Sequence, residues 1–164
     1  MEISSYKKME YEEELNKIIK DIPALTEKKQ NARAEGDLSE NTEYDIASTE
    51  LEQAIQRRAQ LESILTEATV VEANAGPRIS LGCFVEITCL TRPDFGKRIL
   101  RLDAEGSTIN ENPFNRILSI RSPLGQAINN GVSGNYVIQA DAGELEYHVQ
   151  KLQLQEVQEA LNAG

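Results

Sequence analysis

Apolar residues in the first half of the chain recur with the spacing of a coiled coil. From Tyr11 onward they lie alternately four and three residues apart, with the polar Lys29 at one position before Ala32, and a second stretch after Gly36 repeats the alternation with one charged position. This spacing aligns the residues along one stripe of a helix. The stripe positions are Leu15, Ile18, Ile22, Leu25 and Ala32, then Leu51, Ile55, Arg58, Leu61, Leu65 and Ala68.

Two helices of matching period joined by a short glycine-containing break predict an antiparallel helical hairpin. A first helix from Ser5 to Ala34 would be about 45 Å long at about 1.5 Å per residue. Pro23 lies inside this helix. Because proline removes a backbone hydrogen bond, we expect a kink there.

The second half of the chain reads mainly as β-strands. A stretch rich in small residues, glycine and proline, Asn74 to Pro77, marks a linker. Beyond it, β-branched and apolar runs predict strands, and one proline-led segment predicts a short helix. The predicted strands are 83–90, 97–103, 136–140 and 144–152; the helix is 123–128; and 152–161 reads as a loose C-terminal extension.

These elements predict an α+β protein. An N-terminal antiparallel coiled-coil hairpin with an acidic tip occupies residues 1–72, residues 73–78 form a linker, and residues 79–164 form a small, mostly antiparallel sheet domain with one short helix. The paired apolar stripes satisfy each other within one chain, so we expect a monomer.

The charge of the chain argues against binding to free nucleic acid. The formal net charge is −10, and residues 1–72 carry −8 of it, from 9 Lys and Arg against 17 Asp and Glu. Proteins that bind bare DNA or RNA normally present a basic surface to the phosphates. Aromatic residues make up only 5% of the chain, so a large aromatic-lined substrate pocket is not expected.

Two cysteines, Cys83 and Cys89, and one histidine, His148, are too few for a zinc site of these ligand types. Along one strand the two cysteines would face the same side but stand too far apart to bridge. We therefore expect two small free thiols that are buried or half-buried. The N-terminus reads as polar, no apolar run approaches membrane-spanning length, and we expect a cytoplasmic protein without membrane contact.

The break between the two helices is strongly acidic, with five carboxylates in the eleven residues from Glu35 to Asp45. Asp37 and Glu40 stand three apart, so in a helical first turn both can converge on one point. One explanation is purely structural: Gly36 ends the first helix, Asp37 caps the second, and Glu40 reaches back in a capping box.

The other explanation is a metal site. Magnesium prefers oxygen ligands and is usually held by one or two carboxylates together with waters and substrate phosphates. Asp37 and Glu40 would form half of such a site and would need a partner that already holds one metal. Two metals can activate water and stabilise the leaving oxygen in phosphodiester cleavage.

Three segments resemble the Gre transcript-cleavage factors, with the GreA branch favoured over GreB. Residues 34–44 (AEGDLSENTEY) resemble the tip motif, residues 119–127 (SIRSPLGQA) the C-terminal signature, and residues 143–147 (GELEY) the last hairpin of that family. The resemblance implies an FKBP-like C-terminal domain that docks on bacterial RNA polymerase. It also implies a hairpin that enters the secondary channel of the polymerase.

The same resemblance implies roles for individual residues. A Gre factor is not itself an enzyme; it stimulates the polymerase to cleave the backtracked RNA 3′ end. By motif match, Asp37 and Glu40 would hold the second Mg²⁺ ion, only within the polymerase complex. The residues that would support the tip are Asn41, Glu43 and Tyr44, and those that would dock on the polymerase are Ser122, Pro123 and Leu124.

Two stretches depart from the family pattern, and three alternatives stay open. Ile22-Pro23 stands where the family often has Arg-Pro, and residues 110–115 replace a more acidic stretch. The chain could be a Gre-like paralogue that binds the same channel and inhibits transcription. On fold analogy alone it could be a prolyl isomerase or chaperone. It could also be a coiled-coil adaptor whose tip is only a helix cap.

Overall fold

The computed structural model describes residues 1–34, 42–106, 108–109 and 113–163. The chain divides into two compact units, which are considered separately: Lys8–Ala68, and Met1–Lys7 together with Thr69–Gly164. The predicted hairpin domain, 1–72, had included Met1–Lys7 and residues 69–72. In the structure these two segments form part of the sheet-containing unit.

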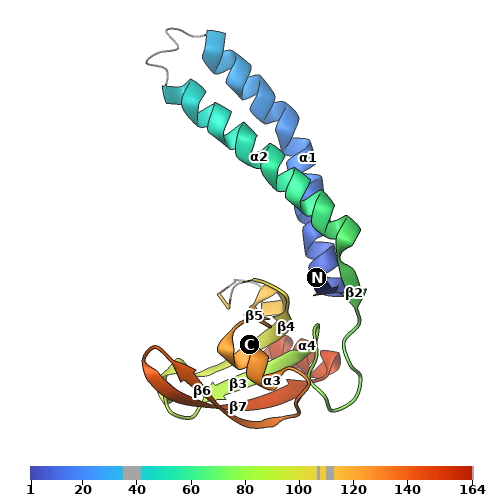
Figure 1. Ribbon diagram of the computed structural model, residues 1–164, viewed down its shortest axis with the longest axis vertical. Coiled ribbons are helices and arrows are strands. Elements are labelled where there is room, and N and C mark those ends of the chain that lie inside the picture. The colour runs from blue at the N-terminus through green and yellow to red at the C-terminus, as the bar shows by residue number, and fades with distance from the viewer. Residues whose placement is uncertain (35–41, 107, 110–112, 164) are drawn as a thin grey trace. The chain divides into compact units, whose positions relative to one another are not determined.

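The first unit is a helical hairpin (Figure 1). Helix α1 spans Ser5–Ala34 and helix α2 spans Thr42–Glu67, and the two run antiparallel. The hairpin fold is therefore confirmed. Helix α1 continues through Pro23, and just beyond it the Thr26 hydroxyl donates to the Ile22 carbonyl at 2.8 Å.

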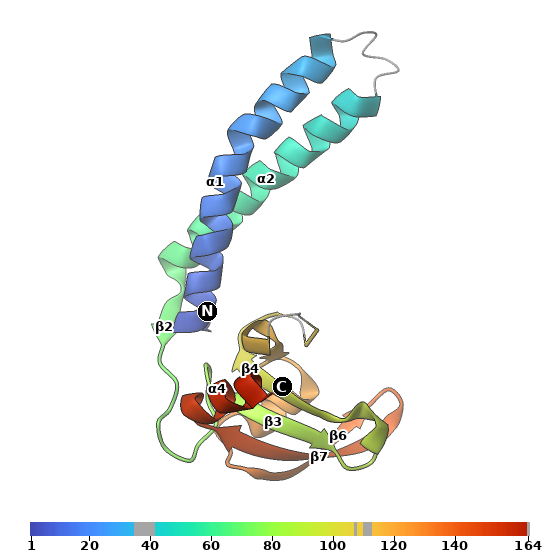
Figure 2. The same cartoon turned by 180° about the vertical axis from the view of Figure 1, so that it is seen from behind.

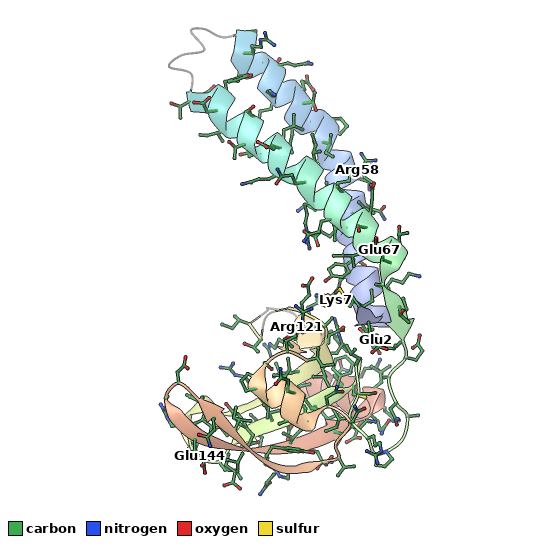
Figure 3. The ribbon with its side chains drawn as sticks, viewed as in Figure 1. Glu2, Lys7, Arg58, Glu67, Arg121 and Glu144 are labelled. Atoms are coloured by element: carbon green, nitrogen blue, oxygen red, sulfur yellow. The ribbon has the colours of Figure 1, made fainter. Side chains whose placement is uncertain are left out.

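The stripe on α2 lies one residue earlier than predicted at two positions. Ile55 was assigned to the interface but is 51% exposed, whereas Ala54 is half-buried. Arg58 is also exposed (Figure 3), and Arg57 lies on the inner side in its place. The prediction followed the larger apolar side chain, but the helix takes a step of three after Leu51 and turns the small, half-buried Ala54 inward instead.

Charged side chains join the two helices of the hairpin. The Arg57 guanidinium donates from Nε and Nη2 to both oxygens of Glu14, at 2.7 and 3.0 Å, and lies 6.0 Å from the Tyr11 ring centroid. Nearer the tip, Lys28 Nζ lies 3.2 Å from Glu50 Oε2. Bidentate arginine pairs of this kind fix geometry as well as charge, so they set how α1 and α2 align.

The second unit is built on a five-stranded mixed sheet with strand order β5-β4-β3-β7-β6 (Figure 2). All neighbouring strands pair antiparallel except β4 and β5, which are parallel. The strands are β3 (Phe84–Cys89), β4 (Lys97–Asp103), β5 (Ile117–Ser119), β6 (Gly134–Ala140) and β7 (Gly143–Leu152). This confirms the predicted α+β class.

Two α-helices lie on opposite faces of this sheet (Figures 1 and 2). Helix α3, Pro123–Ile128, matches the predicted short helix. Helix α4, Leu154–Ala163, was predicted to be a loose extension; it is helical and its Val157 side chain is fully buried. Two short 3₁₀ helices, Pro93–Phe95 and Pro113–Asn115, complete the described elements.

The main core lies between the sheet and α3. It consists of buried apolar side chains that alternate along β3, β4 and β7 with neighbours facing the other way, as strand geometry requires. Its members are Ile79, Cys83, Val85, Ile87, Leu100, Leu102, Leu118, Leu124, Ile128 and Val149. Cys83 and Cys89 are both buried and free, as expected.

The second unit also contains a two-stranded parallel ladder that was not predicted from the sequence. Strand β1, Glu2–Ser4, pairs with β2, Thr69–Val71, so the residues just before α1 lie beside those just after α2. Ile3 is buried in this ladder at 1% exposure. The two ends of the hairpin sequence are thereby brought together.

Ser4 links this ladder to strand β4. Its hydroxyl accepts a hydrogen bond from the Lys7 amide at 3.0 Å, which makes it the N-cap of α1, and donates to the Asp103 carboxylate. Asp103 also accepts from Arg101 Nε at 2.9 Å, and both side chains of this ion pair are at most 1% exposed. The Arg101 guanidinium in turn lies 5.3 Å from the Tyr6 ring centroid.

The predicted linker is held by one buried lysine. Lys151 is 8% exposed, and its ammonium donates to the carbonyls of Asn74, Gly76 and Arg78. Three acceptors satisfy the three donors of an ammonium group. Residues 74–78 are therefore tied to β7.

In the described part of the chain, no helix is long and apolar enough to cross a membrane.

Candidate functional site

The acidic turn lies where the hairpin reverses direction, between the end of α1 at Ala34 and the start of α2 at Thr42. Asp37, Glu40 and Asn41 lie outside the described residues, so their roles stay predictions. Glu43 and Tyr44, also predicted at the tip, lie in the first turn of α2.

The start of α2 concentrates exposed negative charge. Glu43 and Asp45 both lie in its first turn and both side chains are exposed. Acidic side chains there are stabilised by the positive end of the helix dipole. These two carboxylates therefore have a structural role of their own, whatever else they contact.

Tyr44 differs from Glu43 in being turned toward α1. It is half-buried, and Lys29 Nζ lies 5.8 Å from the centroid of its ring. This distance falls within the range of a cation–π contact. Tyr44 thus joins the two helices next to the acidic turn, which fits a role in orienting the tip.

A shallow groove lies beside these residues, between α1 and α2. Its volume is about 550 Å³, and it combines aliphatic, amide and charged side chains. The lining residues are Ala24, Glu27, Lys28, Asn31, Ala32, Glu43 and Ile46. The sequence analysis did not identify Ile46, which is 50% exposed. An apolar residue that lies off the apolar stripe of α2 could have indicated this exposed position.

The second predicted site, Ser122 to Leu124, forms the start of α3. Ser122 is the N-cap: its hydroxyl accepts from the Gly125 amide at 3.1 Å and donates to the Ser119 carbonyl at 2.6 Å. Pro123 follows at the first helical position, where its missing N–H costs no hydrogen bond. Only Pro123 of the three is exposed, because Leu124 is 5% exposed and belongs to the core.

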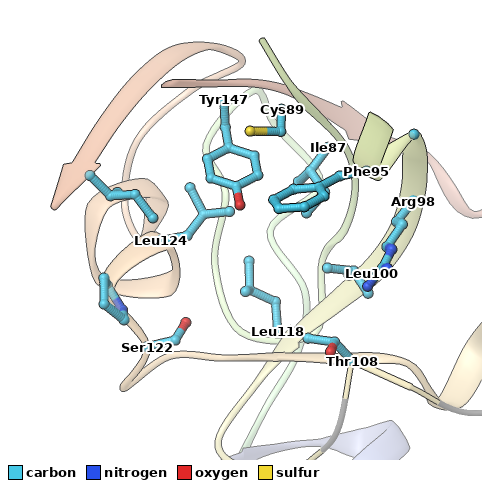
Figure 4. A pocket seen from close by; sticks show the side chains of 13 residues that line it. Ile87, Cys89, Phe95, Arg98, Leu100, Thr108, Leu118, Ser122, Leu124 and Tyr147 are labelled. Carbon is cyan, nitrogen blue, oxygen red and sulfur yellow. The ribbon is translucent and has the colours of Figure 1, made fainter. Parts of the chain in front are cut away.

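An open pocket of about 390 Å³ adjoins the start of α3 (Figure 4). Its wall is mostly aliphatic with two aromatic rings, and all three predicted docking residues contribute to it. The lining residues are Ile87, Cys89, Phe95, Gly96, Arg98, Leu100, Thr108, Leu118, Ser122, Pro123, Leu124, Ile138 and Tyr147.

Burial and hydrogen bonding shift the pKa values of polar groups at this pocket and beside it. Burial raises the pKa of the Tyr147 phenol, and the neighbouring Cys89 thiol adds to the effect. Tyr147 therefore stays neutral and able to donate a hydrogen bond. Just before the lining residue Phe95 in the sequence, a hydrogen bond from Arg92 lowers the pKa of the Asp94 carboxyl, and Arg92 lies 4.8 Å from the Phe95 ring centroid.

Within the described residues, no three His, Cys, Asp or Glu side chains gather closely enough to hold a metal ion. A metal ligand set in that part of the chain would therefore need groups from outside it. The predicted pair, Asp37 and Glu40, lies beyond this statement.

The described residues define the class of protein: an antiparallel helical hairpin, between whose helices the acidic motif falls in the sequence, and a small mixed-sheet unit. The family model described as "Transcription elongation factor, N-terminal" matches residues 2–70, which cover the hairpin and its flanking strands.

Curated relatives extend the match over most of the chain. Transcription elongation factor GreA of Ureaplasma parvum is 32% identical over 130 residues, covering 77% of this chain and 80% of the relative. The protein of the same name from Chlorobium phaeovibrioides is 34% identical over 129 residues, covering 78% and 80%. The chain belongs to the GreA family of transcription elongation factors.

A structural likeness exists to the GreA factor homolog 1 protein of Thermus thermophilus. It covers 92% of this chain and 96% of that one, at 20% identity and a TM-score of 0.42. At that score the likeness adds nothing to the family assignment.

Proposed function

We propose that this chain binds bacterial RNA polymerase, inserts its hairpin into the secondary channel and stimulates Mg²⁺-dependent cleavage of backtracked RNA. The observation that carries the proposal is the position of the acidic motif. The segment with Asp37 and Glu40 joins the last residue of α1 to the first of α2, so it is the reversal point of a hairpin in a GreA family member.

The length of the helices supports such a role. At about 1.5 Å per residue, the 30 residues of α1 span about 45 Å and the 26 residues of α2 about 39 Å. A paired stalk of this length can carry a short turn into a narrow channel while the sheet-containing unit stays outside. The ion pair of Arg57 with Glu14 keeps the two helices aligned along it.

The chemistry of the turn fits magnesium. Asp37 and Glu40 would supply two carboxylate oxygens, the ligand type that Mg²⁺ prefers. When bound, the ion would help activate water for attack on the RNA phosphodiester. The described neighbours support the turn: Tyr44 packs with Lys29 across the hairpin, and Glu43 and Asp45 add negative charge at the start of α2.

The polymerase contact would lie at the start of α3. The exposed Pro123 and the adjoining apolar pocket give the second unit a surface for a partner side chain. In this arrangement Ser122 caps the helix and Leu124 anchors it, so both act by holding Pro123 in place.

The proposal is tested with stalled bacterial elongation complexes and Mg²⁺. The wild-type chain is expected to shorten the transcript, and a double variant with Asp37→Ala and Glu40→Ala to lose at least about tenfold of this activity. Even groups that only orient the ligands of a metal typically cost about 10–100-fold in metal affinity or activity when removed, so direct ligands should cost at least as much. Binding to the polymerase should survive the change.

Two control variants separate the tip from the rest of the surface. Glu13→Ala with Glu52→Ala removes the same charge from exposed positions along the stalk and should cleave normally. Pro123→Arg should lose binding and cleavage together. Full cleavage by the tip variant would support the adaptor alternative, in which the tip is only a helix cap. A wild-type chain that only blocks nucleotide addition would be an inhibitory paralogue.

A further inference from the structure

Strand β6 lies at one edge of the five-stranded sheet. Its pairing with β7 shows which of its backbone N–H and C=O groups point toward β7 and which point away from the sheet. The Leu90 amide donates to the Glu146 carbonyl, so Glu146 and its alternate neighbours on β7 bond toward β3. In antiparallel pairs the bonding direction alternates residue by residue. Tyr147 therefore bonds toward Tyr136 on β6, and the backbone groups of Val137 face outward.

Asn135 and Gln139 share this outward direction with Val137. Among the described hydrogen bonds, none involves the backbone N–H or C=O of these three residues. Their side chains lie on one face of the sheet, where Val137 is 53% exposed. The strand therefore offers a row of backbone donors and acceptors that have no partner within the described chain, with an apolar side chain at its centre.

This edge lacks the usual protection against pairing. Natural edge strands are commonly short or carry lysine, proline or a bulge. The opposite edge follows that rule, because β5 is only three residues long. Strand β6 runs for seven residues, Gly-Asn-Tyr-Val-Ile-Gln-Ala, with no charged residue and no proline.

We propose that β6 pairs antiparallel with β6 of a second copy of this chain, about a twofold axis through Val137. In that register Val137 faces its own counterpart, and Asn135 faces Gln139 of the other copy. All outward backbone groups of the three residues then find partners. No like charges meet, because the strand has none.

The side chains of both faces suit this register. On the exposed face, Asn135 already contacts His148 at 2.7 Å and Gln139 donates to Glu144 at 3.2 Å. Pairing would join these contacts into a continuous amide row across two copies. On the other face, the half-buried Tyr136 would lie opposite Ile138 of the second copy, an aromatic–aliphatic pair that stabilises sheets.

The association should be weak. One strand edge buries less than the roughly 1,200 Å² of a stable interface, so a dissociation constant on the order of 0.1 mM is expected. Sedimentation equilibrium of the full chain from about 10 µM to 1 mM is the direct measurement. The wild-type chain should shift from monomer to dimer across this range.

Two valines of nearly equal exposure give a matched test. Val137→Lys places two like charges opposite each other on the twofold axis and should weaken the dimer by more than about tenfold. Val132→Lys makes the same change at a 49% exposed loop position and should leave the dimer intact. A wild-type chain that stays monomeric throughout, or equal loss in both variants, would overturn the proposal.

Cross-linking tests the register without adding charge. In the proposed pairing, the Cα atoms of directly opposite residues in the two copies lie about 5.5 Å apart. This is within the range of Cα separations that disulfides span. Val137→Cys should form a disulfide dimer on mild oxidation, and a mixture of Asn135→Cys with Gln139→Cys chains should cross-link more than either alone. Val132→Cys should not cross-link. A dimer that fails this pattern would use another surface, which would refute pairing through β6.

Discussion

At the scale of single residues, the segment 119–127 shows how one motif can combine several structural tasks. Ser122 caps α3, Leu124 enters the core, and of these three docking candidates only Pro123 is exposed. The sequence indicated a docking site at all three positions equally. Their division could not be predicted, because burial depends on strands brought in from elsewhere in the chain.

Gly125 provides a sharp test of this close packing. A Cβ at this position would lie 1.9 Å from the Ser119 carbonyl oxygen, so Gly125→Ala must displace the turn before α3. We expect a loss of about 1–3 kcal/mol in the free energy of unfolding, the usual cost of overpacking, although alanine favours helix. Urea unfolding followed by circular dichroism measures it.

The control for this substitution is Gly134→Ala. A Cβ at Gly134 meets nothing within 4 Å, and its backbone is not left-handed. This variant should unfold within about 0.5 kcal/mol of wild type. Equal destabilisation by the two substitutions would contradict the role assigned to the turn at Ser119.

At the scale of elements, the long helices and strands were predictable and the short strands were not. The coiled-coil spacing gave α1 and α2, and β-branched runs gave β3, β4 and most of β7. The missed strands, β1, β2 and β5, have three residues each. Three residues carry no measurable periodicity, and each of these strands pairs with a segment at least fourteen positions away in the sequence.

The prediction of the buried positions on α2 was wrong for a related reason. Periodicity alone permits a step of either three or four after Leu51, and hydrophobicity favoured Ile55. The helix instead turns the half-buried Ala54 inward and places Arg57 against Glu14. Small side chains allow helices to approach closely, and that preference becomes visible only when both helices are present.

The anchoring of α1 to β4 should depend on Asp103. Asp103→Ala leaves the Arg101 guanidinium buried without its carboxylate and removes the partner of Ser4. Breaking a buried pair by removing one partner costs about 3–5 kcal/mol, and thermal or urea unfolding should show that loss. Asp94→Ala, at the exposed pair with Arg92, should leave stability unchanged. A neutral effect at Asp103 would refute the anchor.

At the scale of the whole molecule, the two units differ in how they are stabilised. The sheet-containing unit has a core of ten buried apolar residues. In α2, by contrast, only Ala47 and Leu61 are buried, and the hairpin relies on half-buried stripes and ion pairs. Regions with few buried apolar contacts open at lower free energy than packed cores.

Hydrogen exchange should therefore separate the units. We expect backbone amides of Lys8–Ala68 to exchange more than about tenfold faster than those of β3 and β7, because the hairpin can open while the sheet stays folded. Mass spectrometry of peptides from the full chain measures this difference. Hairpin amides that exchange as slowly as the central strands would show that the two units unfold together.

The cap of α1 has a consequence for the order in which the chain is made on the ribosome. Ser4 is synthesised before both helices of the hairpin, yet its partner Asp103 follows 99 positions later. All of α1 and α2 emerge before that contact can close. During translation the hairpin must therefore form before Ser4 can bond Asp103, although β1 can already pair with β2. Completion of β4 is the step at which Ser4, and with it the first turn of α1, gains its last hydrogen-bond partner.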